Sequence, residues 1–216
     1  MVSRQYYGMT LLGNDVLVCG GSNTQYLSSC ALYIVSLNEW AAAATIPPLP
    51  VAMSSFPMIT LHTRPYVFGG QAGDYRVNTV FTLDISNAWA TRTSMKQAVS
   101  EHTAVALDTN TALVCGGLGS GVQSACFSYA AKEDVWSPAA QMITARHDHG
   151  MAVYKGLFVA DYDLCNYSGT GRVFVYGGLD GPLSSVEMLS YDGQTWATLP
   201  TPMFVATYAF ESVSLP

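Results

Sequence analysis

The sequence predicts an all-β protein made of four similar units, and three observations lead to this prediction. The 216 residues include 19 Gly and 13 Tyr but few charged residues, a composition that favours strands and turns over helices. An apolar run ends in a double glycine four times, at Gly20-Gly21, Gly69-Gly70, Gly116-Gly117 and Gly177-Gly178. A tryptophan follows 18 or 19 residues after each pair, at Trp40, Trp89, Trp136 and Trp196. Such a fixed register indicates an internal structural repeat.

Four short strands are expected in each unit. In the second unit they are roughly 55–61, 65–68, 78–84 and 89–93, because alternating β-branched or aromatic residues there are bounded by Gly, Asn, Asp and Pro. The glycine pair is expected where the backbone takes a positive φ or approaches a neighbour closely. The tryptophan is expected to pack between adjacent sheets. The units span about residues 4–50, 51–97, 98–145 and 146–200, and an extra strand at about 204–214 would begin a fifth.

This pattern resembles the kelch repeat. The shared features are an apolar run before a double glycine, an aromatic residue about a dozen positions later, and the tryptophan; in the fourth unit these are VFVYGG, Tyr191 and Trp196. The resemblance covers essentially the whole chain and implies a kelch-type β-propeller with four recognisable four-stranded blades plus the first strand of a fifth repeat. Four blades and one strand do not match the usual closed rings of the family. Three alternatives follow: a fragment of a longer protein, a four-bladed ring with an extra strand, or closure by a second chain.

The resemblance also implies a function. In kelch propellers the connections between blades and the loops after the double glycines meet on one face, the usual partner-binding surface. We therefore expect a protein–protein interaction module, such as a substrate-recognition or scaffold subunit, whose partner is another protein. The candidate residues of that face are Tyr26, Asp74, Tyr75, Arg76, Gln123, Arg146, His147, Asp148 and Asp180. Each could instead be an ordinary solvated turn residue, and Arg146→Ala is expected to leave folding intact.

The stretch TARHDHG, residues 144–150, places two histidines around a carboxylate and raises the question of a metal site. His149 occupies the same register as Tyr7, Phe56 and His102. A position that accepts tyrosine, phenylalanine and histidine fills space or bridges blades. His147 and Asp148 alone would need further ligands from distant loops. The sequence therefore predicts no metal, no cofactor and no catalytic residue.

The alternative class is a propeller-type enzyme or a carbohydrate-binding protein, similar to a sugar mutarotase or a copper radical oxidase. The oxidase needs two histidines and a crosslinked tyrosine around copper. This chain has four histidines, of which His102 and His149 are assigned to the scaffold and His62 to the opposite face. We therefore expect a protein that is not an enzyme. Saturable sugar binding at Tyr26 and Tyr75 without turnover would indicate the carbohydrate-binding alternative.

Charge and hydropathy exclude two classes of partner. The formal net charge is −6 and no Lys/Arg-rich run occurs, so nucleic-acid binding is not expected. No run of 18 apolar residues occurs, so membrane insertion is not expected. The first residues lack the features of a signal peptide, which predicts a cytoplasmic location. An incomplete propeller would expose apolar blade faces and favour self-association.

Two further features leave alternatives open. Cys19 and Cys30 are separated by 11 positions, as are Cys115 and Cys126, at equivalent places in the first and third units. A disulfide across each ladder is conceivable, but without a secretion signal we expect buried free thiols. The fourth unit carries an insertion at 156–171, which is either a protruding functional hairpin or a tolerated surface loop.

Overall fold

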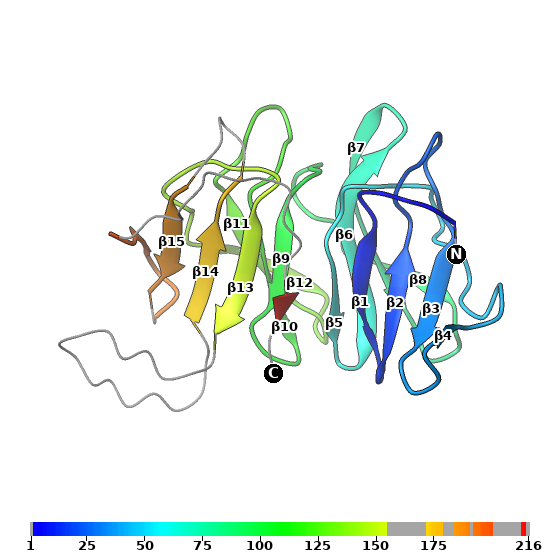
Figure 1. Ribbon diagram of the computed structural model, residues 1–216. Coiled ribbons are helices and arrows are strands. Elements are labelled where there is room, and N and C mark those ends of the chain that lie inside the picture. The colour runs from blue at the N-terminus through cyan, green and yellow to red at the C-terminus, as the bar shows by residue number, and fades with distance from the viewer. Residues whose placement is uncertain (1, 155–171, 179–183, 191, 201–212, 215–216) are drawn as a thin grey trace.

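The computed structural model describes residues 2–154, 172–178, 184–190, 192–200 and 213–214, and it consists of antiparallel sheets without a helix in that part of the chain (Figure 1). The first sheet contains β1 (Gly8–Leu12), β2 (Asp15–Cys19), β3 (Cys30–Ile34) and β4 (Glu39–Trp40). The second contains β5 (Met58–Leu61), β6 (Arg64–Ala72), β7 (Tyr75–Leu83) and β8 (Trp89–Arg92). The third contains β9 (Thr103–Ala106), β10 (Thr111–Cys115), β11 (Cys126–Ala130) and β12 (Val135–Ala139). The fourth contains β13 (Gly150–Tyr154), β14 (Arg172–Tyr176), β15 (Val186–Leu189) and β16 (Trp196–Thr198).

Within each sheet these four strands pair in the order of the chain, so each set of four is an up-and-down blade. The first strands of neighbouring blades, β1, β5, β9 and β13, lie next to one another along the inside of the arrangement (Figure 1). The all-β prediction with four four-stranded blades is confirmed. The four sheets do not close into a ring within the described residues.

The second blade differs from the expected strand bounds. β6 and β7 continue beyond the double glycine as a hairpin that projects past the end of the sheet (Figure 1). The register shifts between Phe68 and Gly70 and then continues to the pair Ala72 and Tyr75. A bulge of this kind bends a strand while keeping it paired. The segment expected to be a loop is therefore an ordered extension of the blade.

The double glycines allow neighbouring blades to approach each other. A methyl group on Gly116 would lie 2.7 Å from Cε1 of His149 in the next blade, and φ of Gly116 is +70°. A side chain at that position would collide with the ring and strain the backbone. The first two blades repeat this contact. The first glycine of each pair lies against an aromatic ring of the next blade, Gly20 against Phe56 and Gly69 against His102. The prediction of a positive φ and a close approach at these glycines is confirmed.

The tryptophans join each blade to the one before it. In each case the indole Nε1 donates a hydrogen bond to a backbone carbonyl. Trp89 donates to Pro47 O (3.0 Å), Trp136 to Thr93 O (2.9 Å) and Trp196 to Ala140 O (2.9 Å). Each acceptor belongs to the segment that leaves the preceding blade. Trp40, in the first blade, has no such acceptor among the described residues and is 41% exposed, against 8% for Trp196. Within the part of the chain that the structure describes, no neighbour therefore covers this side of the first blade.

A chain of backbone hydrogen bonds also runs from blade to blade. Ser55 N donates to Tyr6 O, Glu101 N to Ser55 O and Asp148 N to Glu101 O, each at 2.9 Å. These four residues occupy the same place before the first strand of their blades, and all four have φ between +47° and +58°. Their common backbone conformation fixes the spacing of the blades around the interior.

The expected fifth-repeat strand is described only at its end. Residues 204–212 and the insertion at 156–171 lie outside the described residues. β17 (Val213–Ser214) pairs in parallel with β13 through Ala152 and Val213, so it adds to the inner edge of the fourth sheet.

The expectation of free thiols is wrong in this structure. Cys19 and Cys30 are direct partners across the β2–β3 ladder, and Cys115 and Cys126 are direct partners across the β10–β11 ladder. Both pairs form disulfides, with Cα atoms 4.1 Å apart. The equal spacing of 11 positions had indicated facing side chains. The absence of a secretion signal was the weaker argument, because it says nothing about geometry.

We predict that the two end tryptophans differ in their contribution to stability. Trp196→Ala is expected to lower the free energy of unfolding by about 3–5 kcal/mol, because it empties a buried site and removes an interblade hydrogen bond. Trp40→Ala is expected to cost ~1 kcal/mol or less, because this residue is 41% exposed. Urea unfolding under non-reducing conditions measures both values. Equal losses would contradict the assignment of an unpartnered first blade.

Candidate functional site

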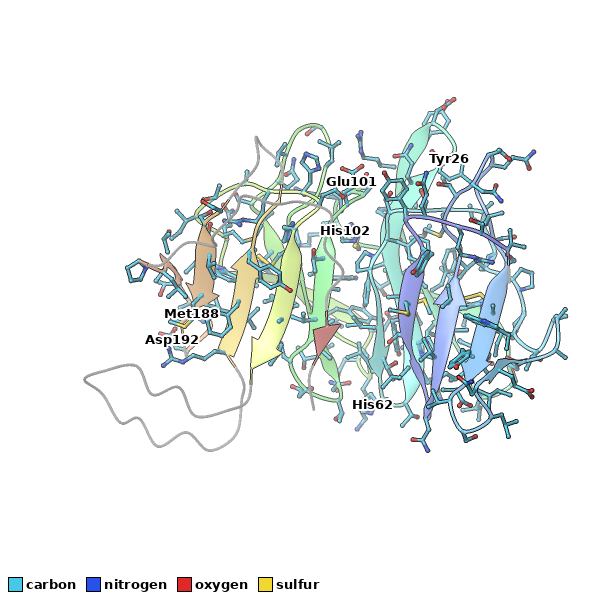
Figure 2. All side chains as sticks on the ribbon, viewed as in Figure 1. Tyr26, His62, Glu101, His102, Met188 and Asp192 are labelled. Carbon is cyan, nitrogen blue, oxygen red and sulfur yellow. A yellow bond between two sulfur atoms is a disulfide. The ribbon has the colours of Figure 1, made fainter. Side chains whose placement is uncertain are left out.

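The loops after the double glycines and the connections between blades lie at one end of the sheets. Isolated bridges join them, pairing Gln5 with Ser22, Ser54 with Gln71 and Ser100 with Leu118. Figure 2 shows Tyr26 and Glu101 towards this end and His62 towards the other. We call this surface the loop face and define it by the segments 5–6, 22–27, 53–55, 71–76, 99–101, 118–123 and 146–148.

The hairpin of the second blade is the most prominent part of the loop face. Tyr75 is 77% exposed at its tip, and Asp74 beside it is also exposed. Arg76 donates from Nε to Ser100 Oγ and from Nη1 to Gly119 O, both at 3.3 Å, so it ties the hairpin to the third blade. Tyr26, in the first blade, is 38% exposed. Arg76 therefore anchors the hairpin to the third blade, while the Tyr75 side chain is exposed to solvent.

Two other candidates contribute less to this surface. The Gln123 side chain donates to Gly121 O at 2.7 Å, and its backbone N donates to Gly117 O, so the residue stabilises its own loop. Asp180 lies outside the described residues.

The structure corrects the expected role of Arg146. Its side chain has no exposed surface and forms an ion pair with the equally buried Glu187 on β15, with Nη2 and Oε1 2.6 Å apart. Nη1 also donates to Gly177 O at 2.8 Å. Glu187 additionally accepts the backbone N–H groups of Ile143 and Thr144. Arg146 therefore fastens the connection between the third and fourth blades and does not present a charge to a partner.

Arg146→Ala is consequently expected to destabilise the protein, contrary to the expectation from sequence. Removing one member of a buried ion pair leaves an uncompensated charge and costs about 3–5 kcal/mol. Arg76→Ala is the matched control, since it removes an arginine of the same face that makes two long hydrogen bonds, and it should cost ~1 kcal/mol. Urea unfolding of both variants is the measurement. Equal losses in the free energy of unfolding would show that the buried ion pair does not stabilise the fold more than the hydrogen bonds of Arg76 do.

Glu101, His147 and Asp148 meet where the third and fourth blades join. Nδ1 of His147 lies 2.7 Å from Oε2 of Glu101 and 3.6 Å from Oδ2 of Asp148. The three side chains are 15–25% exposed. The pKa of Asp148 is raised, first by burial and then by the nearby Glu101 carboxylate. Glu101 was not among the candidates from sequence, although it occupies the position of Asp148 in the preceding unit, and that equivalence could have identified it.

A cavity of about 250 Å³ lies next to this cluster, among the residues that precede or begin the first strands of the blades. Its lining includes Tyr7, Phe56 and Thr103, with Glu101 and Asp148 among the residues at the loop-face end. The cavity could accept a small polar molecule.

His102 and His149 also border the cavity but act as part of the scaffold. Each is almost fully buried, and each ring packs against the first glycine of the preceding blade's pair. Burial lowers the pKa of both imidazoles to about 3, so both are neutral near pH 7. The interpretation of His149 as a residue that bridges blades is confirmed.

These histidines predict a loss of stability in mild acid. Their folded pKa values are depressed, so the unfolded state, with a pKa near 6.5, binds protons that the folded state does not. Stability is therefore fully present above pH 6.5 and falls as the pH drops towards 3, by about 1.4 kcal/mol per pH unit for each histidine. Urea unfolding between pH 7 and 5 measures the slope.

The matched variant is His102→Phe combined with His149→Phe, since Phe56 already fills the equivalent place in the second blade. It should flatten the dependence on pH. Identical slopes in the variant and the parent would show that other groups are responsible.

The blades and their interlocking glycines define the class of protein as an all-β repeat protein of the propeller type. Residues 168–203 match the family model described as Kelch motif. No curated protein matches the chain. The chain therefore contains a kelch motif, and its four-stranded antiparallel sheets are consistent with a kelch-type propeller, so the resemblance found from sequence is confirmed. No helix in the described part of the chain is long and apolar enough to cross a membrane.

Proposed function

We propose that this chain is a protein-interaction module that binds its partner through the loop face. Kelch repeats generally form propeller folds that mediate protein–protein interaction. The observation that carries the proposal for this face is the projecting hairpin of the second blade. Its Tyr75 is 77% exposed, while Arg76 behind it is fixed to the third blade. Tyrosine on a rigid support is a common anchor residue of interfaces.

The charges of the loop face restrict the chemistry of the partner. Asp74, Glu101 and Asp148 supply negative charge, whereas Arg146 is buried against Glu187. Arg76 and Arg4 lie near this surface, and both guanidinium groups are hydrogen-bonded within the fold. These carboxylates would repel an acidic segment. We therefore propose that the partner contacts Tyr26 and Tyr75 through a neutral or basic surface.

The working role that we infer is a substrate-recognition or scaffold subunit, because the described residues supply a surface for binding. In the alternative of a carbohydrate-binding or enzymatic propeller, the ligand would bind in the cavity, whose lining includes the carboxylates of Glu101 and Asp148. A sugar in that cavity would contact Tyr7 and Thr103 and would leave Tyr75 untouched.

The disulfides bear on where such a module would work. Disulfides persist in oxidising compartments and are rare in the cytosol. The two bridges count against the cytoplasmic location predicted from sequence, which stays a prediction.

The proposed function is tested by affinity capture under non-reducing conditions, followed by binding measurements with the purified partner. Combined Tyr26→Ala and Tyr75→Ala substitutions should weaken binding by roughly 10-fold or more, since truncating one anchor costs about 2 kcal/mol. Ile85→Ala is the control, because Ile85 is 89% exposed beyond the other end of β7. Equal weakening by Ile85→Ala, or unchanged binding by the tyrosine variant, would place the site elsewhere. Saturable sugar binding without a protein partner would favour the alternative.

A further inference from the structure

We propose that Glu101, His147 and Asp148 form a binding site for a divalent transition-metal ion, with zinc as the best match. One imidazole nitrogen and two carboxylate oxygens are ligands that Zn²⁺ takes in proteins. The three residues offer ligand atoms that all lie within 4.8 Å of one another. The proposal is independent of the protein partner inferred above.

The fold holds the three ligands in place from two blades. Asp148 N donates to Glu101 O at 2.9 Å, so the backbones of the two connections are fixed to each other. His147 is adjacent to Asp148, and its Nδ1 faces both carboxylates. The sequence predicted no metal because His147 and Asp148 lacked a ligand from a distant loop. The structure supplies that ligand, since the connection of the preceding blade brings Glu101 across the blade boundary.

The scaffold does not require these residue types. The position of Glu101 and Asp148 is held by Tyr6 in the first blade and by Ser55 in the second, with the same positive φ. The position of His147 is held by uncharged residues in the other blades, Gln5, Ser54 and Ser100. In contrast, the ring of His149 is wedged against Gly116 as part of the repeated packing. The two acids and His147 therefore need an explanation other than packing.

The local charge calls for a cation. Neither Glu101 nor Asp148 forms an ion pair with a lysine or arginine within the described ranges. Arg146 is adjacent to His147 in sequence, but Glu187 binds it. Arg76 is bound to Ser100 and Gly119. The two partly buried carboxylate groups offer oxygens within 4.8 Å of each other beside a single imidazole, and a divalent ion at this place would neutralise both.

The site is open enough to load and complete its coordination shell. The three side chains keep 15–25% of their surface exposed, and both carboxylate residues border the cavity. Water can therefore supply the remaining ligands, as in zinc sites that keep an open position. The buried His102 and His149 rings pack against Gly69 and Gly116 and are not assigned as ligands.

The test is isothermal titration of Zn²⁺ into the chelator-treated, tag-free protein with both disulfides intact. A Cys165→Ser background removes the one cysteine outside the two bridges. One equivalent should bind, and Glu101→Gln and His147→Ala should each weaken binding by roughly 10-fold or more. His62→Ala is the control, since His62 is an exposed imidazole bound to Asn110 at the other end of the sheets, and it should bind zinc like the parent.

A thermal shift gives the second readout. Zinc should raise the melting temperature of the parent and of His62→Ala, and should leave Glu101→Gln unchanged. Circular dichroism checks that each variant folds. If Glu101→Gln or His147→Ala does not fold, Asp148→Asn replaces it in both measurements. Absence of zinc binding by the parent, or parent-like binding by the folded Glu101→Gln, His147→Ala and Asp148→Asn variants, would overturn the proposal.

Discussion

The fold depends on the contact between a double glycine and the ring that begins the next blade. Gly20, Gly69 and Gly116 each present bare backbone to the ring of Phe56, His102 or His149. Because no Cβ intervenes, the blades can approach until the ring fills the gap, and the second glycine of each pair then packs on its own blade's aromatic residue. Dense packing of this kind tolerates little change in volume. The tryptophan hydrogen bonds and the three hydrophobic cores between blades follow from this spacing.

The same spacing decides which residues are free for function. The position just before each ring has its backbone fixed by the blade-to-blade hydrogen bonds, but its side chain is exposed in Tyr6 and only partly buried in Ser55, Glu101 and Asp148. Tyr6, Ser55, Glu101 and Asp148 therefore vary in type while their backbones stay alike. A repeat protein can place new chemistry at such a position without disturbing its scaffold, and two acids in successive blades necessarily become neighbours.

The periodic features were readable from sequence because they recur. The glycine pairs, the tryptophans and the scaffold role of His149 each had several copies to compare. Arg146 and Glu187 occur once, in one blade, and only the folded chain shows that they meet 41 positions apart in a buried pair. Glu101 was missed because its partnership with His147 crosses a blade boundary. The disulfides were indicated by their spacing but were set aside on an argument about compartment, which is weaker than an argument from register.

The repeated contacts also say what an additional neighbour of the first blade must provide. In each later blade the tryptophan donates a hydrogen bond to a carbonyl of the preceding blade, whereas Trp40 has no such acceptor in the described part of the chain. Tyr33 covers one edge of the Trp40 ring, at 5.2 Å between centroids, and does not substitute for a blade. A four-bladed ring would have the fourth blade supply this acceptor, and the described sheets are not closed. A surface that covered Trp40 as the other tryptophans are covered would have to carry a carbonyl at the height of the indole.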